Sequence, residues 1–67
     1  MELIISTRDT DGCAHDMARW AKKFHPGWSV TIEQDGPATM VIDADGNKAL
    51  GYDNIWEDFC NADHNAY

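Results

Sequence analysis

The spacing of apolar residues predicts one strand and one long helix in the first part of the chain. Residues 3–7 form a short apolar, β-branched run that favours a strand. After the turn-forming residues 9–12 the apolar spacing changes to that of a helix, and residues 25–27 (His-Pro-Gly) are expected to end it. The apolar face of this helix consists of Cys13, Met17, Trp20, Ala21 and Phe24.

Three short strands are predicted in the middle of the chain. Apolar and polar residues alternate over 28–33, as they do in a half-buried strand. A turn-forming segment at 34–37 separates this strand from residues 39–42, which we expect to pair with it as a hairpin. Asp45-Gly46 is a strong hairpin-turn signal, after which residues 48–52 can return as the third strand.

A second, shorter helix is predicted near the C-terminus. Asn54 and Glu57 have the spacing of a capping box at its start. Its apolar face consists of Ile55, Trp56, Phe59 and Cys60. Residues 62–67 are polar and are expected to fray. The order β-α-β-β-β-α predicts a single α+β domain over residues 1–67, in which one main helix packs on one face of an antiparallel meander.

The length and composition of the chain are those of a small folded domain. It has 67 residues, of which 43% are hydrophobic, including three tryptophans that can fill one compact core. A chain of this length buries only about 60% of its unfolded surface, so we expect low stability. The chain has no apolar run near the roughly 18 residues of a membrane span, and no basic signal-peptide region follows Met1. These features predict a cytoplasmic protein.

Acidic residues dominate the charge of the chain. Twelve acids against five bases give a net charge of −7 at pH 7. This charge repels nucleic acid and anionic membranes and attracts a basic protein surface, although solubility alone also explains it. Residues 24–47 and 49–67 contain acids but no Lys or Arg. The candidate partner-binding acids are Glu33, Asp35, Asp43, Asp45, Asp53, Glu57 and Asp58.

The segment from Met40 to Tyr52 has an acidic-Gly turn before an apolar-Gly-aromatic strand. With this segment and the region from Arg8 to Trp20, the chain resembles the N-terminal half of the GNAT N-acetyltransferases over residues 3–52. The resemblance implies a strand and a helix followed by an antiparallel meander. The family's Gln/Arg-x-x-Gly-x-Gly/Ala loop, which binds the pyrophosphate of acetyl-CoA, does not occur in this sequence. The resemblance therefore implies shared topology without the cofactor site.

Cysteine and histidine residues supply the remaining candidate chemistry. Cys13 and Cys60 are expected to be buried free thiols, with a single disulfide between them as the alternative. Buried thiols are inert, so we expect no nucleophilic enzyme site. A zinc site is a further alternative, although its residues lack the short spacing of a zinc knuckle. Its ligands would be Cys13, His15, Cys60 and His64.

These observations together predict a non-enzymatic, protein-binding module that needs no cofactor and contacts neither nucleic acid nor membranes. Its acidic hairpin and C-terminal helix are expected to face a basic surface of a larger protein, such as a nucleic-acid-handling enzyme that it modulates. Small, acidic, single-domain chains are also expected among accessory proteins of bacteriophages and mobile elements. The alternatives are a zinc-stabilised structural domain and a truncated acetyltransferase-like domain, and a homodimer is one expected assembly.

Overall fold

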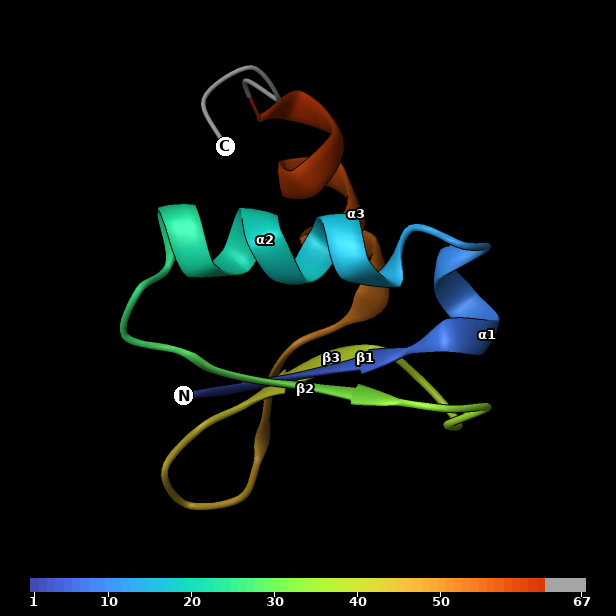
Figure 1. Ribbon diagram of the computed structural model, residues 1–67. Helices are drawn as coiled ribbons and strands as arrows, with labels where there is room; N and C mark the ends of the chain where they lie inside the picture. Colours follow the sequence, from blue (N-terminus) through green and yellow to red (C-terminus); the bar gives the residue numbers. More distant parts are fainter. Residues whose placement is uncertain (63–67) are drawn as a thin grey trace.

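The computed structural model describes residues 1–62 and contains a four-stranded sheet with three helices (Figure 1). The elements in chain order are β1 (Glu2–Ser6), α1 (Thr7–Thr10), α2 (Ala14–Phe24), β2 (Ser29–Glu33), β3 (Met40–Ile42), β4 (Lys48–Leu50) and α3 (Tyr52–Asn61). The predicted α+β class is confirmed. The fraying predicted for residues 62–67 falls almost wholly outside the described residues.

The sheet is mixed, with the strand order β2-β1-β3-β4. β1 pairs with β2 in parallel and with β3 in antiparallel, and β3 pairs with β4 in antiparallel. The predicted hairpin between residues 28–33 and 39–42 is therefore wrong, because β1 lies between these two strands. α2 carries the chain back to the start of β1, and a strand that follows such a helical crossover runs parallel to the first.

The long helix α2 confirms most of the predicted apolar face. Met17, Trp20 and Ala21 are buried, and the helix ends at Phe24 with His25 as its C-cap. Phe24 itself was expected in the core but is 42% exposed. It occupies the last helical position, directly before the loop that leads to β2.

The single-turn helix α1 was not predicted from the sequence. Thr7 is predicted at the end of the first strand, and residues 9–12 are predicted to form a turn. The Ser6 hydroxyl caps this turn by accepting the Arg8 amide at 3.3 Å. The helix ends at Asp11 and Gly12, which have positive φ angles of 49° and 93°. Gly adopts positive φ readily, and Asp does so more often than most other residues.

The last helix begins earlier than the capping-box spacing predicted. β4 ends at Leu50, Gly51 is the N-cap, and α3 starts at Tyr52 rather than at Asn54. This start lets the Tyr52 ring stack on Trp56, with the ring centroids 5.7 Å apart. Cys60, expected on the apolar face, is exposed because one further residue of helix turns it away from Phe59.

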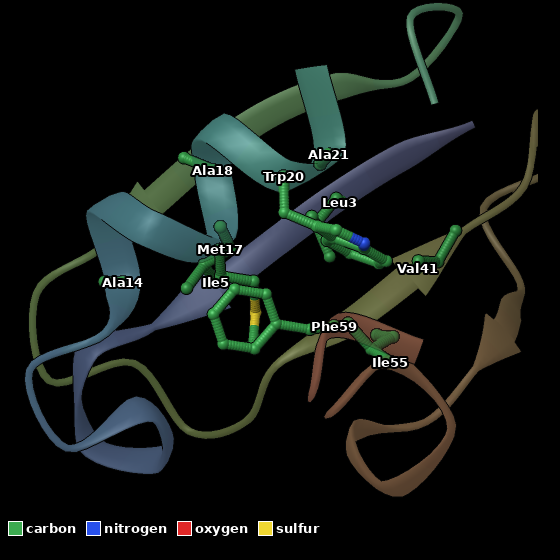
Figure 2. Close-up of a cluster of buried hydrophobic side chains, with 10 residues drawn as sticks. All are labelled: Leu3, Ile5, Ala14, Met17, Ala18, Trp20, Ala21, Val41, Ile55 and Phe59. Carbon is green, nitrogen blue, oxygen red and sulfur yellow. The ribbon is translucent and has the colours of Figure 1, made fainter. Parts of the chain in front are cut away.

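The hydrophobic core lies between the sheet and the helices α2 and α3, which both lie on the same side of the sheet (Figure 1). Figure 2 shows Trp20 of α2 and Phe59 of α3 in one cluster with the sheet residues Leu3, Ile5 and Val41, and the two aromatic rings lie 5.9 Å apart. The prediction of helical packing on one face is confirmed. The buried apolar residues are Leu3, Ile5, Ala14, Met17, Ala18, Trp20, Ala21, Val41, Ile55 and Phe59.

Candidate functional site

A buried polar network lies at the C-terminal end of β1, where α1 and the loop of residues 34–39 meet. The Ser6 amide donates to Thr39 Oγ1 at 2.9 Å, and the Ser6 hydroxyl donates to the Gly36 carbonyl. The Thr10 hydroxyl donates to the Ser6 carbonyl at 3.2 Å. Ser6, Thr10 and Thr39 are almost fully buried, so these hydrogen bonds are shielded from water.

Asp9 connects this network to the loop after β2 and to α3. Its carboxylate accepts the Thr39 amide at 2.6 Å, and its carbonyl accepts the Tyr52 hydroxyl at 2.8 Å. On the β2 side, Thr7 Oγ1 accepts the Asp35 amide at 2.9 Å. These bonds hold three separate segments, residues 6–10, residues 35–39 and the start of α3, at the end of the sheet that carries α1 (Figure 1).

Five acidic residues lie along this end of the sheet, from the end of β2 at one edge to the start of α3 after β4 at the other, and we call this end the acidic end. They are Asp9, Asp11, Glu33, Asp35 and Asp53. Because β1 and β2 are parallel, their C-terminal ends meet here, with Ser6 opposite Glu33. All of these acids except the half-buried Asp9 are exposed. The acidic end is therefore a fixed, solvent-facing concentration of negative charge.

The other predicted acids lie elsewhere. Asp43 and Asp45 are in the β3–β4 loop, at the opposite end of the sheet, because β3 runs antiparallel to β1. Asp43 Oδ1 accepts the amides of Asp45 and Asn47 at 2.9 Å, which is an ordinary role for Asp in a turn. Glu57 and Asp58 lie on the exposed side of α3. The seven predicted residues therefore do not form a single face.

Sequence reasoning missed two members of the acidic end, Asp9 and Asp11. Both belong to the turn-forming residues 9–12 that precede the long helix, which is a sufficient local reason for acids at those positions. The signal that could have placed them was the β-helix-β order, which predicts parallel pairing and brings the ends of both strands together.

The described residues of the alternative zinc site, Cys13, His15 and Cys60, are not gathered into a metal centre. Cys13 is the half-buried N-cap of α2, Cys60 is exposed on α3, and both are free thiols. His15 is exposed on α2, and His64 lies outside the described residues. Within residues 1–62, no group of three or more Cys, His, Asp or Glu side chains could hold a metal ion.

The three tryptophans pack on the core, as predicted. Trp20 is buried, while Trp28 and Trp56 are half-buried against the core cluster. The His25 ring stacks on Trp28 at a centroid distance of 3.7 Å and an interplanar angle of 3°. Trp20 meets both rings edge-on. This cluster therefore contributes to stability at the end of the sheet opposite the acidic end.

The sheet face turned away from the helices carries a small apolar patch that sequence reasoning did not identify. Ile4, Met40 and Ile42 are half-buried and alternate along their strands with the buried residues of the core. In Figure 1 neither α2 nor α3 covers this face. The signal in the sequence was the uninterrupted apolar character of β1 and β3, which is typical of strands covered on both faces.

Tyr52 provides a prediction about alkaline pH. Burial raises the pKa of the Tyr52 phenol above its ordinary value, and the nearby Asp9 carboxylate adds to this effect. The folded state thus holds this proton more tightly than the unfolded state does. The resulting stabilisation is complete below about pH 10 and is lost as the pH rises through the folded-state pKa. In a Tyr67→Phe background Tyr52 is the remaining tyrosine. Absorbance titration of this variant should give a higher Tyr52 pKa in the folded protein than in the urea-unfolded chain.

The Tyr52→Phe variant is the matched control for this prediction. It loses the hydrogen bond to Asp9 and should be about 1 kcal/mol less stable near neutral pH. Its stability difference from the parent should shrink above pH 10. Equal tyrosine pKa values in the folded and unfolded chains would contradict the prediction.

Neither a protein-family model, nor a curated protein, nor a solved structure matches this chain. The resemblance to the GNAT family therefore stays a prediction. Within residues 1–62, no helix is both long enough and apolar enough to cross a membrane. The same residues enclose no pocket.

Proposed function

We propose that this protein is a non-enzymatic binding module whose acidic end docks on a basic surface of a larger protein. The observation that carries this proposal is the gathering of Asp9, Asp11, Glu33, Asp35 and Asp53 at one end of the sheet. Acids that are clustered on one side create a directional field. Such a field steers a basic partner into one orientation and raises the rate of association.

The hydrogen-bond network supports this proposal because it fixes the backbone that carries the acids. Asp35 has a positive φ of 55°, and its amide is held by Thr7 at 2.9 Å. Asp9 is held through Thr39 and Tyr52. Carboxylates on a fixed backbone lose little conformational entropy on binding, and this preorganisation favours affinity.

The partner class follows from the chemistry of the acidic end. Spaced carboxylates can occupy the sites that a basic protein uses for phosphates, so a nucleic-acid-handling enzyme is the partner we propose. In this role the protein is a small modulator of the kind expected from bacteriophages or mobile elements. A cytoplasmic location belongs to the same proposal, because Cys13 and Cys60 are free thiols.

A charge-neutralised variant tests the proposal. Asp11→Asn, Glu33→Gln, Asp35→Asn and Asp53→Asn remove four charges from the acidic end while keeping side-chain size. Asn tolerates the positive φ at positions 11 and 35, and Asp9 is kept because it accepts the Thr39 amide. The partner captured from host lysate by the parent protein should bind this variant at least about tenfold more weakly in titration calorimetry.

The matched control removes four charges elsewhere, through Glu2→Gln, Asp45→Asn, Glu57→Gln and Asp58→Asn. It has the same net charge as the first variant and should bind the partner almost as well as the parent does.

Raising the salt to about 1 M shortens the screening length to about 3 Å and should weaken parent binding. An equal loss of affinity in both variants would show that binding depends on net charge and not on the position of the acids. Salt-resistant binding would point to the apolar patch of Ile4, Met40 and Ile42.

A further inference from the structure

The strand β2 lies at one edge of the sheet and presents backbone groups to its open side. The Ser29 amide donates to the Met1 carbonyl at 3.0 Å, so the hydrogen-bonding groups of Ser29 point toward β1. Backbone direction alternates along a strand, so Thr31 and Glu33 also bond toward β1. Val30 and Ile32 therefore direct their N–H and C=O groups away from the sheet, where no other described strand pairs with them.

The two edges of the sheet differ in how they are protected against further pairing. β4, at the other edge, has three residues and begins with Lys48, and its pairing with β3 contains a register shift. Short length, lysine and bulges are the usual devices that prevent edge-to-edge association. β2 has five regular residues and contains no lysine, proline or bulge. The unprotected edge is therefore β2.

We propose that two copies of this chain pair through β2 in antiparallel orientation, with a two-fold axis at Thr31. In this register Val30 of each copy lies opposite Ile32 of the other, and the outward backbone groups of both residues are satisfied. Thr31 lies opposite its own counterpart, which is a favourable cross-strand pair. Ser29 lies opposite Glu33 of the second copy, so no like charges face each other.

The distribution of charge favours this antiparallel arrangement. Glu33 and Asp35 lie at the end of β2, whereas Lys22 and Lys23 lie at the end of α2, close to where β2 begins. Both lysines are exposed. Antiparallel pairing therefore brings the acids of one copy toward the lysines of the other, while parallel pairing would bring acids to acids. This inference goes beyond the proposed function and does not depend on it.

Site-specific cross-linking tests this register. In a Cys13→Ser, Cys60→Ser background, Thr31→Cys places one thiol at the proposed two-fold axis. Residues opposite each other in a non-hydrogen-bonded pair have Cα atoms about 4.5 Å apart, which is within the range of a disulfide. Ser29→Cys is the matched control, because Ser29 is equally exposed but its two copies would lie about 13 Å apart.

Mild oxidation should convert Thr31→Cys to a covalent dimer and leave Ser29→Cys monomeric on a non-reducing gel. In the unmodified protein, the Val30 and Ile32 amides should become more protected from hydrogen exchange as the concentration rises. The Thr31 amide should stay protected throughout, because it faces β1. Equal cross-linking of both variants, or Val30 and Ile32 exchange that is independent of concentration up to about 1 mM, would overturn the proposal.

Discussion

Replacing Trp20 with Ala should lower the free energy of unfolding by about 3–5 kcal/mol. Trp20 is only 2% exposed and meets His25, Trp28 and Phe59 edge-on, with ring centroids 5.2, 6.3 and 5.9 Å away. Trp20 thus joins α2 to both α3 and the loop before β2. Because small domains often have only about 5 kcal/mol of stability, the variant should be largely unfolded at 37 °C.

Urea unfolding followed by circular dichroism measures this effect, and Lys22→Ala is the control. Lys22 is exposed on the same helix, so its replacement should change the stability by less than about 0.5 kcal/mol. A Trp20→Ala variant that unfolds at the same urea concentration as the parent would show that α2 is rotated from the orientation described above.

Replacing Thr39 with Val should lower the stability by about 1–3 kcal/mol. Valine keeps the shape of threonine but removes the hydroxyl oxygen that accepts the Ser6 amide at 2.9 Å. Both residues are almost fully buried, so water cannot take the place of this acceptor. The cost arises because a buried N–H group is left without a partner.

The Thr39→Ser variant separates the hydroxyl from the methyl group. It keeps the acceptor oxygen and should lose less stability than Thr39→Val in the same urea experiment. In Thr39→Val, the amides of the 34–39 loop should also exchange faster, since this loop is held through Ser6 and Asp9. If Thr39→Val is as stable as the parent, the network does not hold the acidic end in place.

The sequence predicted most elements of the fold but not the pairing of the strands. The alternation of Val30 and Ile32 with polar residues locates β2, and the spacing of Met17, Trp20 and Ala21 locates α2, because both patterns are local. Which strand lies beside which depends on contacts between distant residues. The turn-forming residues at 34–37 suggested a hairpin, whereas the loop passes the end of β1 and is held there by hydrogen bonds from Ser6 to Gly36 and Thr39.

The same pairing of distant strands determines which acids belong to the candidate site. Composition identified the acids as the most distinctive feature, but it gave no reason to group Asp9 and Asp11 with Glu33 and Asp35. They meet because β1 and β2 are parallel. Asp43 is distant from them because β3 runs the other way. The start of α3 differs from the prediction for a related reason. Tyr52, which the sequence pattern assigns to a strand, is the first residue of the helix and donates its hydroxyl to the Asp9 carbonyl.

The central claim, that one end of the sheet is the acidic docking surface, is tested most directly by an NMR titration with a ten-residue polylysine peptide. Amide chemical shifts should change mainly in residues 8–12, 33–36 and 52–54, and salt should reverse the changes because exposed charge attraction is screened. The control segment is 43–47, which carries Asp43 and Asp45 at the other end of the sheet. Equal shifts in 43–47, or shifts concentrated on Glu57 and Asp58, would contradict the claim.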